Sequence, residues 1–139
     1  MKWTTDSPSP GDIIRVKVKF YYHYGIFVDE NTVVQFGYPD NEGIPPKEIA
    51  VVTTDVETFL AGGFGETASI TKAESKSRRS PQKTVDYALS KVGTTGYNIL
   101  HNNCEHFVNE CVFGNKTASY TDSIRQKIKN KLKNRKEKQ

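Results

Sequence analysis

Residues 102–114 read NNCEHFVNECVFG, a pattern that predicts a helix from Cys104 to Phe113. Asparagine is a preferred helix cap, so the Asn pair would place the cysteine in the first turn. Gly114 would end the helix, and four apolar residues at helical spacing would face the core: Phe107, Val108, Cys111 and Val112. The thiol of Cys104 would then lie at the positively polarised end of the helix, which lowers a thiol pKa.

Most of the segments before this helix have strand patterns. They cover residues 12–20, 21–28, 33–36, 48–53 and 66–71. Asp55 can cap a short helix that ends at Ala61, and Ser80 can cap a longer one that Gly93 stops. The longer helix would have Pro81 in its first position and an apolar stripe of Val85, Ala88, Leu89 and Val92. Strands mostly precede helices, which predicts an α+β domain with helices on one face of an antiparallel sheet.

Length and composition indicate one globular domain. The chain has 139 residues, 35% hydrophobic and 26% charged, which excludes a membrane protein and full disorder. There is no apolar run of about 18 residues, and MKWTTDSPSPGD lacks a secretion signal, so we expect a cytoplasmic protein. Cys104 and Cys111 would lie about 10 Å apart in one helix and cannot bridge, and two unpaired thiols fit a reducing compartment.

We expect three regions: an irregular lead-in at 1–10, a globular domain at 11–119, and a basic tail at 120–139. The tail has eight Lys or Arg and two acidic residues, whereas the rest of the chain is slightly acidic. Ile124, Ile128 and Leu132 are spaced four apart, which indicates a helix with a narrow apolar stripe. Peripheral contact with an anionic membrane and a merely solvated tail both fit this pattern, and nucleic acid fits it less well.

A nucleophilic thiol needs a base, and the sequence offers three histidines. His106 follows Cys104 by two residues in one helix, so it would point away from the sulfur. His101 lies in the loop before the helix and remains a candidate. His23 lies in a strand among aromatic residues, where a core histidine bonded to backbone is the alternative. Cys104 itself could also be a small buried residue like Cys111.

Gln35 is the suitable partner for the far nitrogen of a His23 base, because it lies on the neighbouring strand. The two face the same side only if paired residue numbers sum to an even value. A three-residue loop Asp29–Asn31 would satisfy this, pairing Gly25 with Gln35 and Val28 with Thr32. A regular two-residue or four-residue loop without a bulge would separate them. Taken alone, a polar strand residue such as Gln35 is more often solvent-facing.

No metal site is expected, because the histidines and cysteines lack paired ligand spacing. Three tyrosines surround the candidate base: Tyr21, Tyr22 and Tyr24. They could shape its pocket or donate to an oxyanion, but strand packing is the expected role for at least two of them.

Five blocks of the sequence resemble the lecithin retinol acyltransferase family. They are Pro10-Gly11-Asp12-Ile13-Ile14, His23-Tyr24-Gly25-Ile26-Phe27-Val28, Val33-Val34-Gln35-Phe36, Gly96-Tyr97-Asn98-Ile99-Leu100 and Asn103-Cys104-Glu105-His106-Phe107. They stand in family order and run from about Pro10 to Gly114. The resemblance implies a permuted papain-like fold of the NlpC/P60 superfamily, in which an antiparallel sheet packs against the helix that bears the nucleophilic cysteine.

The resemblance also implies acyl transfer from a glycerophospholipid through a thioester, as a thiol acyltransferase or a phospholipase A-type hydrolase. It assigns Cys104 as nucleophile and His23 as base, and it implies no cofactor. Better-known members have a second histidine where this chain has Gln35, but a neutral amide can orient an imidazole, so we expect activity to survive. The alternatives are an NlpC/P60-type cysteine peptidase or amidase, and a non-catalytic interaction protein on the same fold.

Overall fold

The computed structural model describes residues 2–18, 21–38, 44–61, 70–74, 78–98, 103–114 and 131. The strands are β1 (Lys2–Thr4), β2 (Ile13–Lys17), β3 (Tyr22–Asp29), β4 (Thr32–Phe36), β5 (Val51–Thr54) and β6 (Ile70–Glu74). The helices are α1 (Val56–Ala61), α2 (Pro81–Ser90) and α3 (Cys104–Phe113), with a 3₁₀ turn at Pro46–Glu48. The strands form one antiparallel sheet in the order β1-β6-β2-β3-β4-β5, so the predicted α+β class is confirmed.

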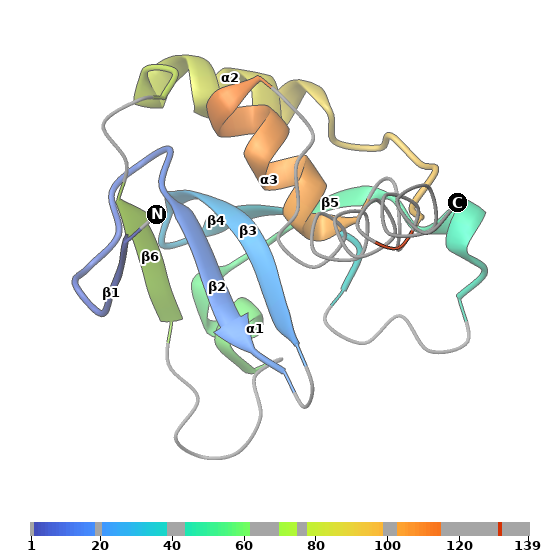
Figure 1. Cartoon of the computed structure of the whole chain (residues 1–139), viewed down its shortest axis with the longest axis horizontal. Helices are drawn as coiled ribbons and strands as arrows, with labels where there is room; N and C mark the ends of the chain where they lie inside the picture. Colours follow the sequence, from blue (N-terminus) through green and yellow to red (C-terminus); the bar gives the residue numbers. More distant parts are fainter. Residues whose placement is uncertain are drawn as a thin grey trace.

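The helices lie on both faces of this sheet. α2 and α3 cover one face and α1 lies on the other (Figure 1). Neighbouring residues of β2 show why both faces need cover: Ile13 packs in the core under α3, whereas Ile14 packs with Phe59 of α1. Successive strand residues point to opposite faces, so a strand with adjacent buried residues must be covered on both sides. The prediction of helices on one face therefore holds for α2 and α3 and is wrong for α1.

The β3–β4 hairpin has the predicted register but not the predicted loop. Gly25 pairs with Gln35, as an even sum requires, but Asp29 rather than Val28 pairs with Thr32. The register shifts between Phe27 and Asp29, so one extra residue of β3 is accommodated as a bulge. The bulge with a two-residue turn has the same effect on side-chain direction as the three-residue loop that the sequence suggested.

The predicted helix starts are confirmed. Asp55 accepts a hydrogen bond from the Thr58 N–H at 2.6 Å, and Ser80 accepts one from the Lys83 N–H at 3.3 Å. The apolar stripe predicted for α2 is only half right, because Leu89 is 41% exposed and Val92 is 45% exposed. α2 ends at Ser90, so Val92 lies beyond it, and the buried face of α2 consists of Thr84, Val85 and Ala88.

The described strands differ in their bounds from the sequence prediction, most of all at β1, β5 and β6. Lys2–Thr4 form an edge strand within the predicted irregular lead-in, where Trp3 packs against Tyr24 with ring centroids 6.0 Å apart. β5 begins at Val51 because the preceding residues form the 3₁₀ turn. β6 extends to Glu74, further than predicted, and residues 66–69 of that prediction lie outside the described residues. The predicted helix of the tail also lies outside them, apart from Lys131.

Candidate active site

The first turn of α3 is built by a reciprocal capping box. The Asn103 side chain accepts a hydrogen bond from the His106 N–H at 3.0 Å, and His106 Nδ1 accepts one from the Asn103 N–H at 3.1 Å. This pair satisfies two backbone donors at the helix start. It also gives His106 the structural role that its position two residues after Cys104 predicted.

Cys104 occupies the first position of α3 and is 7% exposed. The backbone N–H groups of Tyr24, Glu105 and Cys104 lie close enough to the sulfur to stabilise a thiolate. Burial outweighs these donors and raises the pKa of the Cys104 thiol to about 11, with the charge of Glu105 acting in the same direction. The predicted lowering of this pKa by the helix N-terminus is therefore wrong for this structure: burial is the larger effect, and the thiol is protonated at neutral pH.

His23 and Gln35 form the pair that the hairpin register predicted. Nε2 of His23 lies 2.8 Å from Oε1 of Gln35, and both side chains are almost fully buried. An amide oxygen can only accept, so Nε2 bears the proton and Nδ1 of the neutral ring has an open lone pair. Burial lowers the pKa of His23 to about 4, while the Gln35 hydrogen bond acts in the opposite direction. The imidazole is therefore neutral at pH 7 and able to accept a proton at Nδ1.

The backbone of β3 directly after His23 approaches the thiol of Cys104, but the side chains of His23 and Cys104 pack on different faces of the sheet. The ring of His23 packs on Phe59 of α1 with centroids 5.3 Å apart, whereas Cys104 belongs to the core beneath α2 and α3. The N–H of Tyr24, which belongs to the peptide bond directly after His23, lies against the sulfur. The structure thus brings His23 and Gln35 together and places Cys104 beside the backbone of His23, with no hydrogen bond between thiol and imidazole among the described residues.

Tyr97 is a neighbour of Cys104 that sequence reasoning missed. Its pKa is raised above the usual range by burial, and the charges of Cys104 and Tyr21 act in the same direction. The ring stands edge-on to Phe36 with centroids 5.2 Å apart, which fixes it beside the start of α3. Its position directly after Gly96 and shortly before the helix was the available signal, but this signal does not distinguish a site residue from a packing residue.

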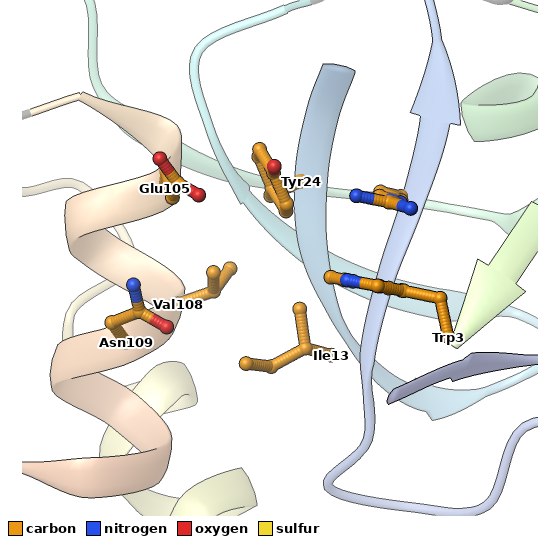
Figure 2. A pocket seen from close by; sticks show the side chains of 7 residues that line it. Trp3, Ile13, Tyr24, Glu105, Val108 and Asn109 are labelled. Carbon is orange, nitrogen blue, oxygen red and sulfur yellow. The ribbon is translucent and has the colours of Figure 1, made fainter. Parts of the chain in front are cut away.

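A pocket of about 210 Å³ lies next to the start of α3, between that helix and β1, β2 and β3. Its lining residues are Trp3, Ile13, Arg15, Tyr24, Glu105, Val108 and Asn109 (Figure 2). Tyr24 and Glu105 point toward each other across its rim in Figure 2. Arg15 and Glu105 were not singled out by the sequence, because a charged residue on a strand or in a first helical turn is usually solvated.

Two further expectations concern metal binding and membrane crossing. Among the residues that the structure describes, no group of three or more His, Cys, Asp or Glu side chains could hold a metal ion. None of the described helices has the length and apolar character needed to cross a membrane. The remaining candidate base, His101, lies outside the described residues.

Comparison with known proteins gives one family. The family model described as lecithin retinol acyltransferase matches residues 6–117. Lecithin retinol acyltransferase of Bos taurus is 25% identical over 139 residues, covering 86% of this chain and 60% of the relative. Phospholipase A and acyltransferase 3 of Homo sapiens is 26% identical over 137 residues, covering 92% of this chain and 83% of the relative. The chain thus spans only 60% of the length of the bovine lecithin retinol acyltransferase.

Proposed function

The chain belongs to the lecithin retinol acyltransferase family, and from this we propose that it transfers or hydrolyses an acyl ester of a glycerophospholipid through a thioester on Cys104. The relatives named as acyltransferase and phospholipase A support the reaction class. The observation that carries the proposal is the position of Cys104 at the capped start of α3, with the N–H of Tyr24 from the sheet against its sulfur. These backbone donors provide the polar surroundings that an acyl-transfer oxyanion needs.

In the first half of the proposed reaction, Nδ1 of His23 takes the proton of the Cys104 thiol as the sulfur attacks the ester carbonyl carbon. The tetrahedral intermediate has a negative oxygen, which the N–H groups at the start of α3 stabilise. Its collapse breaks the bond to the glycerol oxygen, which takes the proton from His23 and leaves as part of a lysophospholipid. The acyl chain remains on sulfur as a thioester.

In the second half, a water, alcohol or amine attacks the thioester, with His23 again taking the proton. The new acyl bond forms, the carbon–sulfur bond breaks, and the proton returns to Cys104. Gln35 holds Nε2–H through the 2.8 Å hydrogen bond, which keeps the ring in one tautomer throughout. Because thiol and imidazole are both neutral before reaction, proton transfer and attack occur together. The proposed reaction therefore requires that His23 and Cys104, whose side chains pack on opposite faces of the sheet in this structure, meet when substrate is bound.

The test is intact-protein mass spectrometry after incubation with vesicles of phosphatidylcholine and phosphatidylethanolamine. We expect a mass gain of one acyl chain on the wild-type protein and on Cys111→Ala, and none on Cys104→Ala. His23→Asn should form the adduct far more slowly, because the asparagine cannot accept the thiol proton. Cys111→Ala is the matched control, since it removes a buried thiol of the same helix.

Absence of both the adduct and released fatty acid from the folded wild-type protein would overturn the proposal. In that case, rapid alkylation of Cys104 by iodoacetamide would favour a cysteine amidase or peptidase. Slow alkylation would favour an interaction protein on the same fold, because a buried thiol with a raised pKa reacts poorly without an assisting base.

A further inference from the structure

The N–H of Tyr24 that lies against the sulfur of Cys104 needs more support than this contact gives it. Sulfur is a weak hydrogen-bond acceptor, so the contact contributes little to holding strand and helix together. Tyr24 pairs with Arg15 of β2, but the pairs between β3 and β4 begin only at Gly25 and Gln35. The position of this backbone donor relative to α3 therefore depends on how the Tyr24 side chain is held.

The phenol of Tyr24 is hydrogen-bonded to two charged side chains, Arg15 of β2 and Glu105 of α3. A guanidinium can only donate and a carboxylate can only accept, so the phenol accepts from Arg15 and donates to Glu105. Figure 2 shows Tyr24 and Glu105 pointing toward each other. The two bonds form a chain with one direction, from β2 through β3 to the first turn of α3. Bonds to charged groups are roughly twice as strong as neutral ones, so this chain links sheet and helix firmly.

Aromatic rings fix the Arg15 end of the chain. The guanidinium carbon of Arg15 lies 3.8 Å from the ring centroid of Trp3 and 3.9 Å from that of Tyr22. Trp3 also packs on the ring of Tyr24, with centroids 6.0 Å apart. Stacking on both faces fixes the plane of the guanidinium and with it the direction of the N–H donors. The phenol is therefore held in place from the side of the sheet.

The Glu105 end of the chain lies directly after Cys104, so Tyr24 contacts two successive residues of α3. Its N–H meets the sulfur, and its phenol meets the next side chain. Two contacts prevent the start of the helix from turning or sliding along β3, which one contact would allow. A displacement of about 1 Å can cost about 10²-fold in rate, so this link matters for a donor to an oxyanion.

The charge of Glu105 works against a thiolate. After burial, it is a further cause of the raised pKa of the Cys104 thiol. Glu105 therefore does not activate the sulfur through its charge. Its contact with Tyr24 is the contribution that favours the reaction.

We propose that Arg15, Tyr24 and Glu105 are positioning residues, whose hydrogen-bond chain holds the Tyr24 N–H at the sulfur of Cys104. The inference rests on the proposed function, in which this N–H helps to stabilise the oxyanion, and deepens it by assigning the side chains that place the donor. The three side chains act on the reaction through the placement of that N–H.

The first experiment measures kcat and KM for fatty-acid release from vesicles of phosphatidylcholine and phosphatidylethanolamine. We expect Tyr24→Phe and Glu105→Ala each to lower kcat about tenfold, the usual effect of losing a hydrogen bond to a charged group, with KM nearly unchanged. Glu105→Gln retains an acceptor oxygen and should keep kcat within about threefold of the wild type. Arg15→Met should lower kcat less than Tyr24→Phe, because the bond between Tyr24 and Glu105 remains.

Tyr87→Phe is the matched control, since it removes a Tyr–Glu hydrogen bond of 2.7 Å at the last turn of the same helix. It should lower the urea midpoint as Tyr24→Phe does, but leave kcat unchanged. A kcat loss in Tyr24→Phe no larger than that in Tyr87→Phe would overturn the proposal. An equal loss in Glu105→Gln and Glu105→Ala would also overturn it, because the acceptor oxygen would then have no role of its own.

The second experiment needs no catalysis. Amide hydrogen exchange, followed by NMR on the full chain, gives the rate at Tyr24 relative to the rate at Ile26, which pairs with both β2 and β4. A global loss of stability raises both rates, so the ratio reports on the local support of Tyr24. We expect Tyr24→Phe and Glu105→Ala to raise the ratio about tenfold, and Glu105→Gln and Tyr87→Phe to leave it unchanged.

The two experiments separate the positioning role from the proposed function. A raised ratio in Tyr24→Phe without any acyl adduct on Cys104 of the wild type would retain the hydrogen-bond chain as the support of Tyr24 and reject the proposed function. Acyl adducts on Cys104 together with an unchanged ratio would retain the function and reject the positioning role.

Discussion

The first and last turns of α3 each have a buried cysteine, and the two sites differ in what surrounds the sulfur. Cys104 is 7% exposed and Cys111 is fully buried, and burial raises the thiol pKa at both positions, to about 11 and about 12. Burial and pKa therefore do not separate a candidate nucleophile from a packing residue. The difference lies in the neighbours: Cys104 has backbone donors from two elements, including Tyr24 of the sheet, whereas only its own backbone N–H donates toward Cys111.

Each cysteine also has a tyrosine neighbour whose pKa is raised mainly by burial, with the charge that the cysteine has as a thiolate acting in the same direction. The partner of Cys104 is Tyr97, in the segment before α3, and the partner of Cys111 is Tyr87 of α2. Tyr87 donates a hydrogen bond to Glu110 at 2.7 Å and lies under the guanidinium of Arg79, so it is fixed by structural contacts. The two ends of one helix thus provide an internal comparison between the setting proposed for a reactive cysteine and a structural setting for the same side chains.

The largest expected contrast is between Cys104→Ala and Cys111→Ala. Loss of the nucleophile should lower the rate of fatty-acid release at least about 10³-fold, as for other activated nucleophiles. Cys111→Ala should stay within about threefold of the wild-type rate, because its effect is a small cavity worth about 1 kcal/mol of stability. Fatty-acid release from vesicles measures the first effect and urea unfolding measures the second. Equal rates for Cys104→Ala and Cys111→Ala would show that the first and last turns of α3 do not differ in their role in catalysis.

The next contrast concerns His23, the neutral imidazole proposed as the base for Cys104 in the first turn of α3. The pKa of His23 is about 4 in the folded protein and about 6.5 when unfolded, so the unfolded state binds the proton first as pH falls. Stability is complete above pH 6.5 and is lost between about 6.5 and 4, by up to about 3 kcal/mol. Urea unfolding at pH 7, 5.5 and 4.5 should show this loss in the wild type and a weaker one in His23→Gln. In the pH profile of kcat/KM, the midpoint of the acidic limb should likewise lie near pH 4.

Parallel slopes for wild type and His23→Gln would show that the imidazole is not buried and neutral as described. An acidic limb of kcat/KM near 6.5 would lead to the same conclusion for the active enzyme. Either result would remove the argument that thiol and imidazole are both neutral before reaction.

Much of the first turn could be predicted from the sequence, because its determinants are local. Asn103 caps, Cys104 begins and Gly114 ends α3, as a short sequence pattern requires. The pairing of Gly25 with Gln35 is the register that the sequence argument required for a His23–Gln35 pair, although a bulge rather than a longer loop produced it. The predicted low thiol pKa failed because burial by residues distant in sequence outweighs the local helix effect.

The other features that the sequence did not predict depend on residues distant in sequence. The exposure of Leu89 depends on which part of α2 meets the sheet, and the roles of Tyr97 and Arg15 depend on neighbours from other elements. An aromatic residue before a helix or an arginine on a strand has many environments that are compatible with its own sequence context. Only the packed fold places Trp3 and Tyr22 on the two faces of Arg15.

A smaller contrast compares the two tyrosines. Tyr97→Phe should lower the rate about tenfold, the usual effect of removing one hydrogen-bond donor near a reacting thiol, and leave stability nearly unchanged. Tyr87→Phe should have the opposite outcome: an unchanged rate and a loss of about 1 kcal/mol, because Glu110 loses its 2.7 Å hydrogen bond. Rates and urea midpoints of the two variants check this. A rate loss in both would indicate that the tyrosines act on the fold rather than on the sulfur.

The smallest contrast compares the ends of α3 themselves. Asn103→Ala removes the cap and should cost about 1 kcal/mol of stability, and Asn103→Ser should restore most of it, because serine also caps well. Gly114 ends the helix with φ 80°, and a Cβ there would meet Nη2 of Arg79 at 2.9 Å, so Gly114→Ala should cost about the same. The two variants differ in rate at saturating lipid. Only Asn103→Ala loosens the backbone that positions Cys104, so it alone should lower kcat, by about threefold to tenfold. Equal kcat losses at both ends would mean that α3 responds as one rigid body and that the first turn has no separate role in holding the thiol.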